Sequence, residues 1–164
     1  MGNIKYYNEF IKEEQSFGEK LQFQLNQFRN RKGNLENLIL NNLDEDLGDK
    51  VNSITEDNPF LMHYGNHLKI KRKVKKKEKK IKDINTNLSN LRKDLSLVNK
   101  LNSNSDKEKQ KTTINEKISK AQDQKKNLEE EINDLQSRAS DLEKEISELI
   151  KNREDQLKDI QSNV

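Results

Sequence analysis

Two histidines spaced four residues apart are the first candidates for chemistry in this sequence. His63 and His67 would lie on one face of a helix, a spacing that can hold a metal ion. No glutamate follows His63 as in the zinc-protease pattern, no third ligand is obvious, and the chain has no cysteine. We therefore predict no metal site and no cofactor, and we interpret the histidines as a pair at the surface or at the edge of a helix seam.

Carboxylates are abundant, but their positions argue against acid–base catalysis. Glu143, Glu145 and Glu148 fall at exposed positions of the heptad pattern described below, where nothing would tune a proton transfer. The chain offers no thiolate nucleophile, and its 5 glycines are scattered singly rather than gathered in a phosphate-binding loop. The sequence therefore predicts no catalytic residue, no small-molecule substrate and no enzymatic activity.

A block of basic residues is the most distinctive chemical feature. Residues 67–82 carry 10 basic side chains and one acidic, whereas residues 1–66 carry 7 and 11 and residues 83–164 carry 15 and 17. On a helix these basic residues surround almost the whole circumference, and one acidic partner helix can cover only one side. The candidates for contact with phospholipid headgroups or nucleic-acid phosphate are Lys69, Lys71, Arg72, Lys73, Lys75, Lys76, Lys79, Lys80 and Lys82.

The competing interpretation of this block is a solvated face that pairs in part with acidic residues 129–131. Of the two anions, lipid is favoured, because a surface that stacks single-stranded bases needs interleaved aromatic residues, and only Tyr64 is close. No apolar run approaches the about 20 residues of a membrane span or resembles a secretory signal. We expect an intracellular protein, either cytoplasmic or peripheral at a membrane.

The composition indicates which elements position these residues. Only 29% of the residues are hydrophobic and 37% are charged, whereas a typical globular domain is roughly half apolar and about a quarter charged. So little apolar material cannot form a thick core, but a seam between long helices needs only about two apolar residues in seven. With Pro59 as the single proline, the sequence predicts an all-α fold built on coiled coils.

The clearest heptad pattern runs through residues 106–162. Apolar residues recur there at spacings of three and four, which places them in a narrow stripe facing a partner helix. The a and d positions from 114 to 149 are Ile114, Ile118, Ala121, Lys125, Leu128, Ile132, Leu135, Ala139, Leu142, Ile146 and Leu149. We predict one long helix here, with a capping box that begins at Ser105.

A second heptad pattern covers residues 59–101. Its a and d positions from 70 to 98 are Ile70, Val74, Lys77, Ile81, Ile84, Leu88, Leu91, Leu95 and Val98. Asn58 is placed to cap this helix, and Pro59 suits its first turn because proline has no N–H to leave unpaired. A seam lysine such as Lys77 is typical of residues that set register or oligomeric state.

Together the two patterns predict an antiparallel coiled-coil hairpin over residues 59–164, with its turn at 102–105. A connection this short favours antiparallel neighbours, and folding about it places Lys77 near Glu130. The predicted seam residues are Ile81, Ile84, Leu88, Leu91, Leu95, Leu128, Ile132, Leu135, Leu142, Ile146 and Leu149. The alternative is one continuous helix in a long parallel dimer, although consecutive residues of poor helix propensity argue against it.

The N-terminal segment, residues 1–48, has a wider apolar stripe. Its a and d positions hold Tyr7, Phe10, Phe17, Leu21, Phe28, Leu35 and Leu38, and the adjoining e positions hold Ile4, Ile11, Leu25 and Ile39. A stripe of this width suits a helix that packs against two partners. We predict a helix over about residues 4–47, with Gly48 as its C-terminal cap, followed by a linker at 49–58.

These elements predict three long helices, with the first packed along the hairpin, and a homodimer, because the third helix outruns the second. The predicted function is a non-enzymatic scaffold that binds itself and another helical protein. A rival hypothesis is a membrane-surface protein, since a three-helix dimer with a lysine-rich side resembles BAR-type membrane-shaping domains in length, helix count and charge placement. That resemblance implies binding of anionic lipid through the basic block, and nucleic-acid binding through the same block is a third hypothesis.

Overall fold

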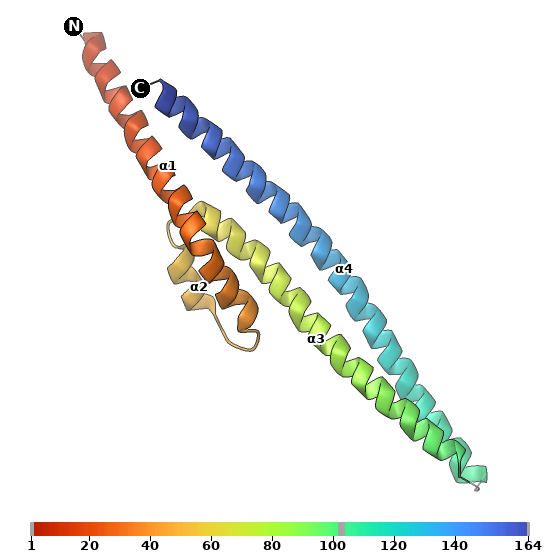
Figure 1. Ribbon diagram of the computed structural model, residues 1–164. Helices are drawn as coiled ribbons and strands as arrows, with labels where there is room; N and C mark the ends of the chain where they lie inside the picture. Colours follow the sequence, from red (N-terminus) through yellow and green to blue (C-terminus); the bar gives the residue numbers. More distant parts are fainter. Residues whose placement is uncertain (1, 102–103, 164) are drawn as a thin grey trace. The chain divides into compact units, whose positions relative to one another are not determined.

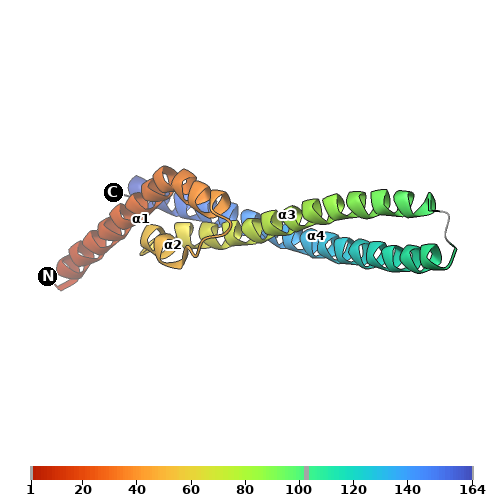
Figure 2. The same cartoon turned by 90° about the horizontal axis from the view of Figure 1, so that it is seen from below.

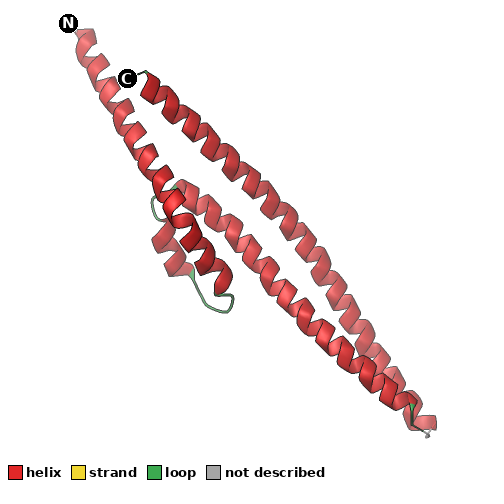
Figure 3. Cartoon of the chain, in the orientation of Figure 1, coloured by secondary structure: helices red, strands yellow, loops and turns green. Residues whose placement is uncertain are grey.

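The computed structural model describes residues 2–101 and 104–163 (Figure 1). This part contains no strand, and its elements are α1 (Gly2–Asn41), α2 (Gly48–Thr55), α3 (Pro59–Asn99) and α4 (Asn104–Ser162) (Figure 3). The predicted all-α fold is confirmed, with four helices in the described part where three were predicted. Within the same residues, no helix combines the length and the apolar character that crossing a bilayer requires.

Two compact units divide the chain, the first formed by residues 1–72 with 138–164 and the second by residues 73–137. Both α3 and α4 contribute to each unit. In the first unit, α1 and α2 join the first part of α3 and the last part of α4 around one hydrophobic cluster. In the second unit, the remaining parts of α3 and α4 pack closely side by side (Figures 1 and 2).

The core of the first unit lies where α1 meets α3. Its most buried apolar side chains, each at most 1% exposed, are Leu25, Leu35 and Ile39 of α1 and Phe60, Leu61 and Leu68 of α3. Phe28 joins the two groups, because its ring centroid lies 6.2 Å from that of Phe60 and 5.7 Å from that of Tyr64. Leu157 of α4 belongs to the same cluster. From Leu21 to Ile39 the apolar stripe of α1 is therefore buried against α3 and α4, whereas Phe17 is exposed.

The segment predicted as a linker, residues 49–58, holds most of the short helix α2. Leu47 and Val51 are buried in the core of the first unit, at 3% and 4% exposure. A helix of 8 residues is too short to be stable by itself, so this burial against α1 is what holds it. This helix was not predicted from the sequence, because about two helical turns of apolar spacing are too weak a pattern to distinguish from a loop.

The end of α1 also differs from the prediction. The helix stops at Asn41, because the run of Asn and Asp that follows offers side-chain hydrogen bonds that compete with helix formation. Two of these bonds are present: the Asn42 amide donates to the Leu38 carbonyl at 3.0 Å, and Asp46 Oδ1 accepts from the N–H of Gly48 at 3.1 Å. Gly48 therefore begins α2 instead of capping α1.

Asn58 caps the start of α3 and links this helix to α1 by hydrogen bonds. Its side-chain oxygen accepts hydrogen bonds from the N–H groups of Phe60 and Leu61, at 3.1 and 3.2 Å, which confirms the predicted helix cap. Its amide nitrogen donates to the Gln24 carbonyl and to Gln27 Oε1, both at 2.9 Å. Asn58 is fully buried, and both of its polar atoms have the partners that burial requires.

The predicted seam residues are all withdrawn from solvent, although to different degrees. The buried ones are Leu88, Leu91, Ile132, Leu135 and Ile146, and the half-buried ones are Ile81, Ile84, Leu95, Leu128, Leu142 and Leu149. The helix ends lie within two residues of the prediction, since α3 ends at Asn99 and α4 begins at Asn104. The predicted capping box therefore starts inside α4, and positions 102–103 of the predicted turn lie outside the described residues.

Replacing Asn58 tests the cap and the tie to α1. Asn58→Ala removes two acceptor bonds and two donor bonds at a buried site, so we expect the free energy of unfolding to fall by about 2–4 kcal/mol. Urea denaturation followed by circular dichroism measures this loss. Asn66→Ala, at an exposed position of the same helix, is the matched control and is expected to change stability little. Equal losses for both variants would contradict the assignment.

Candidate functional site

Within the second unit, the lysines of α3 form two exposed stripes. The first stripe, Lys73, Lys76 and Lys80, recurs at helical spacings of three and four, and so does the second stripe, Lys75, Lys79 and Lys82, on another side of the helix. All six residues are exposed, because the apolar seam occupies the side of α3 that packs on α4. The basic block therefore presents positive charge on both flanks of α3 in this unit.

A groove runs beside the first stripe. Lys77 lies between that stripe and the seam, and its Nζ is 2.5 Å from Oε2 of Glu131. The first stripe and Lys77 form one wall of the groove, which holds about 530 Å³, and Glu131, Asp134 and Leu135 of α4 form the other. Four lysines face two carboxylates here, so positive charge is in excess. The sequence predicted Glu130 beside Lys77, and the structure places the next residue there.

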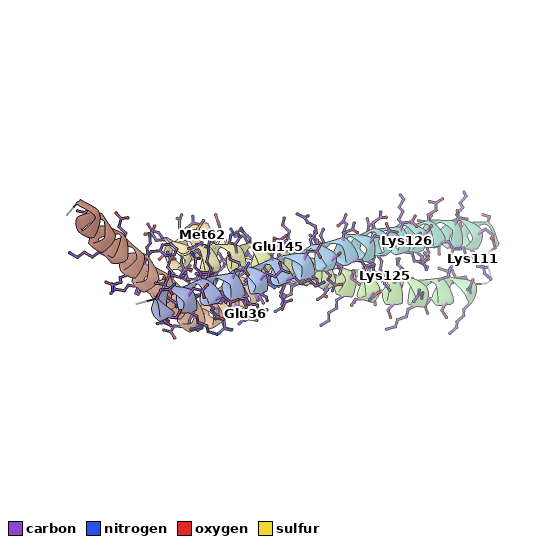
Figure 4. All side chains as sticks on the ribbon, turned by 90° about the horizontal axis from the view of Figure 1, so that it is seen from above. Glu36, Met62, Lys111, Lys125, Lys126 and Glu145 are labelled. Atoms are coloured by element: carbon purple, nitrogen blue, oxygen red, sulfur yellow. The ribbon has the colours of Figure 1, made fainter. Side chains whose placement is uncertain are left out.

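The second lysine at a seam position, Lys125, is half-buried, whereas its neighbour Lys126 is exposed (Figure 4). The aliphatic stem of a lysine can lie along apolar neighbours while its ammonium group reaches water. Lys77 is half-buried as well and adds the ion pair with Glu131. Both seam lysines thus fit between the helices without placing an unpaired charge in a core.

In the first unit, Arg72 has a structural role. Its guanidinium donates hydrogen bonds to the carbonyl oxygens of Asn42, Leu43 and Glu45, at 2.8, 3.1 and 2.6 Å. These carbonyls follow the end of α1, where backbone acceptors lack helical partners. Net charge alone did not distinguish this half-buried arginine from the lysines grouped with it. The exposed members of the basic block in this unit are Lys69 and Lys71.

His67 is buried in the first unit, at 2% exposure, and stacks on Tyr64 with 5.9 Å between ring centroids. Burial lowers the pKa of His67, nearby Lys71 lowers it further, and a hydrogen bond to the backbone of Ala139 opposes the shift. Its Nδ1 has no hydrogen-bond partner among the described residues. The charges of Glu143 and Glu36 also favour protonation, but burial outweighs them and the neutral form of His67 is favoured.

Tyr64 connects this histidine to the protein surface. Its hydroxyl donates to Oε2 of Glu36 at 3.2 Å. Burial, the negative charge of Glu36 and this hydrogen bond raise the pKa of Tyr64 to about 12. The hydroxyl therefore stays protonated, and able to donate to Glu36, further into alkali than an ordinary tyrosine, and the pair links α3 to α1.

The remaining candidates for chemistry are at the surface. His63 is exposed, and so are Glu143, Glu145 and Glu148, although Glu143 is close enough to Tyr64 and His67 for its charge to raise the pKa of both. In the part of the chain that the structure describes, no group of three or more His, Cys, Asp or Glu residues is placed to hold a metal ion. The two histidines are therefore not a pair at one surface, because His63 is exposed and His67 is buried in the core.

No family model, no curated protein and no solved structure matches this chain when sequences and structures are compared. Its function is therefore inferred from the burial, contacts and charges described above. Two surfaces stand out for that purpose: the lysine stripes of the second unit, and the exposed aromatic residues of α1 in the first.

The lowered pKa of His67 predicts a loss of stability in acid. Below the ordinary value of 6.5 the unfolded chain binds a proton that the folded chain resists, so the free energy of unfolding falls as the pH drops from 6.5 towards the lower folded pKa. His67→Gln is expected to lose less stability than the wild type between pH 7.5 and pH 5. His63→Gln, which changes an exposed histidine, should keep the wild-type dependence. Urea titrations at the two pH values measure all three, and an unchanged slope in His67→Gln would disprove the assignment.

Proposed function

We propose that this chain is a non-enzymatic scaffold. In this proposal α3 and α4 form an antiparallel coiled-coil hairpin, α1 packs on the hairpin, and the chain associates with a second copy and with another helical protein. The strongest support is the distribution of apolar side chains, which recur every three or four residues along α4 and are separated by charged ones. A narrow stripe of this kind is stabilised by pairing with another helix surface.

The order of facing residues supports the antiparallel hairpin. Lys77 of α3 pairs with Glu131 of α4. Further along α3, Ile84 lies on one shallow groove together with Gln124 and Leu128 of α4. Residue numbers thus rise along α3 while the numbers of the α4 residues opposite them fall, as an antiparallel pair requires.

Self-association is the first test of the scaffold. Sedimentation equilibrium of the 164-residue chain is expected to give twice the mass of one chain, because α1 leaves large apolar side chains exposed, Phe17 at 46% and Phe23 at 64%. A single-chain mass at all concentrations up to the millimolar range would reject self-association.

A parallel rod would also sediment as a dimer, so a second arm of this test separates the two arrangements. The chain has no cysteine, and Lys125→Cys introduces a single one at a seam position. In a parallel dimer the two new cysteines would face each other and form a disulfide between chains on mild oxidation. In the hairpin each faces α3 of its own chain, so we expect no covalent dimer on a denaturing gel. Exposed Lys126→Cys is the control for random collision.

Binding of an anionic lipid surface is the second candidate function. The supporting observation is the groove in which four lysines face only two carboxylates, together with a second lysine stripe on another side of α3. Each lysine near an anionic bilayer contributes about 1 kcal/mol, and added salt weakens this attraction. Headgroup phosphates would meet both stripes without any apolar insertion.

Co-sedimentation with vesicles of phosphatidylserine and phosphatidylcholine tests this candidate. Changing the first stripe, Lys73, Lys76 and Lys80, to glutamine removes three charges, so we expect the partition coefficient to fall on the order of 100-fold. The matched control changes three exposed lysines of α4 in the same unit, Lys109, Lys117 and Lys120, to glutamine. If the wild type does not pellet, or if both triple variants lose binding equally, the lysine stripe is not a lipid site.

A further inference from the structure

A groove in the first unit lies where α1 runs alongside the last turns of α4. It holds about 720 Å³, and its apolar lining comes from Gly18 and Phe23 of α1 and from Leu157 and Ile160 of α4. Asn58, which caps α3, donates to the Gln24 carbonyl of α1, so α3 begins beside a part of α1 that follows Gly18 (Figure 1). At Gly18 the neighbours within reach of the apolar stripe are Leu157 and Ile160 of α4.

Gly18 brings the two helices close together. A Cβ atom at this position would lie 3.2 Å from Cγ2 of Ile160 and 3.8 Å from Cδ1 of Leu157. A larger residue would push α4 away from α1 and open the groove. At the bottom of the groove, α1 and α4 are therefore in close contact at Gly18, and Leu157 and Ile160 form part of its apolar surface.

Exposed aromatic residues accompany the groove. Phe23 is 64% exposed and Phe17 is 46% exposed, although aromatic residues make up only 5% of the chain. Phe23 lines the groove, whereas Phe17 does not. A large apolar side chain exposed beside an apolar groove is typical of a protein-binding site on a highly charged chain.

The polar residues around the groove indicate the kind of partner. Residues 15–28 of α1 include only two charged side chains, Glu19 and Lys20, in a chain that is 37% charged. One of the two, Glu19, lines the groove together with four amide side chains, and among these Gln22 donates to Asn26 Oδ1 at 3.1 Å. Near a two-fold axis each residue meets its own copy, so a charged residue there is repelled. An amide both donates and accepts, so it can bond to its own copy.

We infer that this groove is the surface through which two copies of the chain associate. In this arrangement, which rests on the self-association proposed above, the Phe23 ring of each copy enters the groove of the other. The Gln22 amides face each other near the two-fold axis, and α1 of the second copy occupies the side of the stripe that α3 does not reach.

Sedimentation equilibrium of the full chain and of two variants tests the surface. Phe23→Glu places a charge in the groove and is expected to raise the dimer dissociation constant at least about tenfold, since buried aromatic residues dominate such interfaces. Met62→Glu changes a side chain that is 54% exposed on α3 of the same unit, and it should leave the constant unchanged. Circular dichroism checks that both variants keep the wild-type helix content.

A charge swap tests the two-fold arrangement. Gln22→Glu and Gln22→Lys are each expected to weaken association, because like charges meet at the axis, and an equimolar mixture should recover it as a mixed dimer. If the wild type and Phe23→Glu are equally dimeric, the groove is not the interface and the proposed self-association still stands. A monomeric wild type overturns both proposals. If the mixture of Gln22→Glu and Gln22→Lys forms no mixed dimer, the two Gln22 side chains do not face each other across a two-fold axis.

Discussion

Burial of a narrow apolar stripe is the interaction on which this structure depends. A chain with 29% hydrophobic residues has too little apolar surface for a thick core, and long helices side by side bury that surface with the fewest apolar residues. The second unit contains little more than such a stripe, with Leu88 and Leu91 of α3 and Ile132 and Leu135 of α4 buried. Charged residues cover the remaining faces and keep them in water.

The first unit has a broader core and places polar groups inside it. Asn58 is fully buried with all its hydrogen bonds made, and Arg72 closes the backbone carbonyls that follow α1. Buried polar groups with satisfied partners fix one arrangement of the helices, because any other packing would leave them unpaired. Two buried nitrogens, Nδ1 of His67 and Nε of Arg72, have no hydrogen-bond partner among the described residues, and the lowered pKa of His67 favours the neutral form that suits its burial.

The two candidate surfaces have opposite chemistry. In the second unit the lysines of α3 outnumber the carboxylates that face them, which suits an anionic partner, and binding of the proposed lipid surface would weaken with added salt. In the first unit the groove at Gly18 and Phe23 is lined by apolar and amide side chains with Glu19 as its one charged residue, which suits a contact with an identical surface better than an anionic partner. A scaffold that joined copies through one surface could use the other for a different partner, since each depends on a different physical interaction.

The sequence by itself determined the bounds of α3 and α4 to within two residues. Apolar residues at spacings of three and four are a local pattern, so α3 and α4 lie within two residues of their predicted ends and Asn58 caps α3 as expected. The tertiary structure alone decided the rest: α2 exists because Val51 is buried against α1, and Arg72 turns inward because free carbonyls lie opposite it. The groove depends on Gly18 meeting α4, a contact between residues far apart in the chain. Periodicity reports which face of a helix is apolar, but only packing selects the neighbour that covers it.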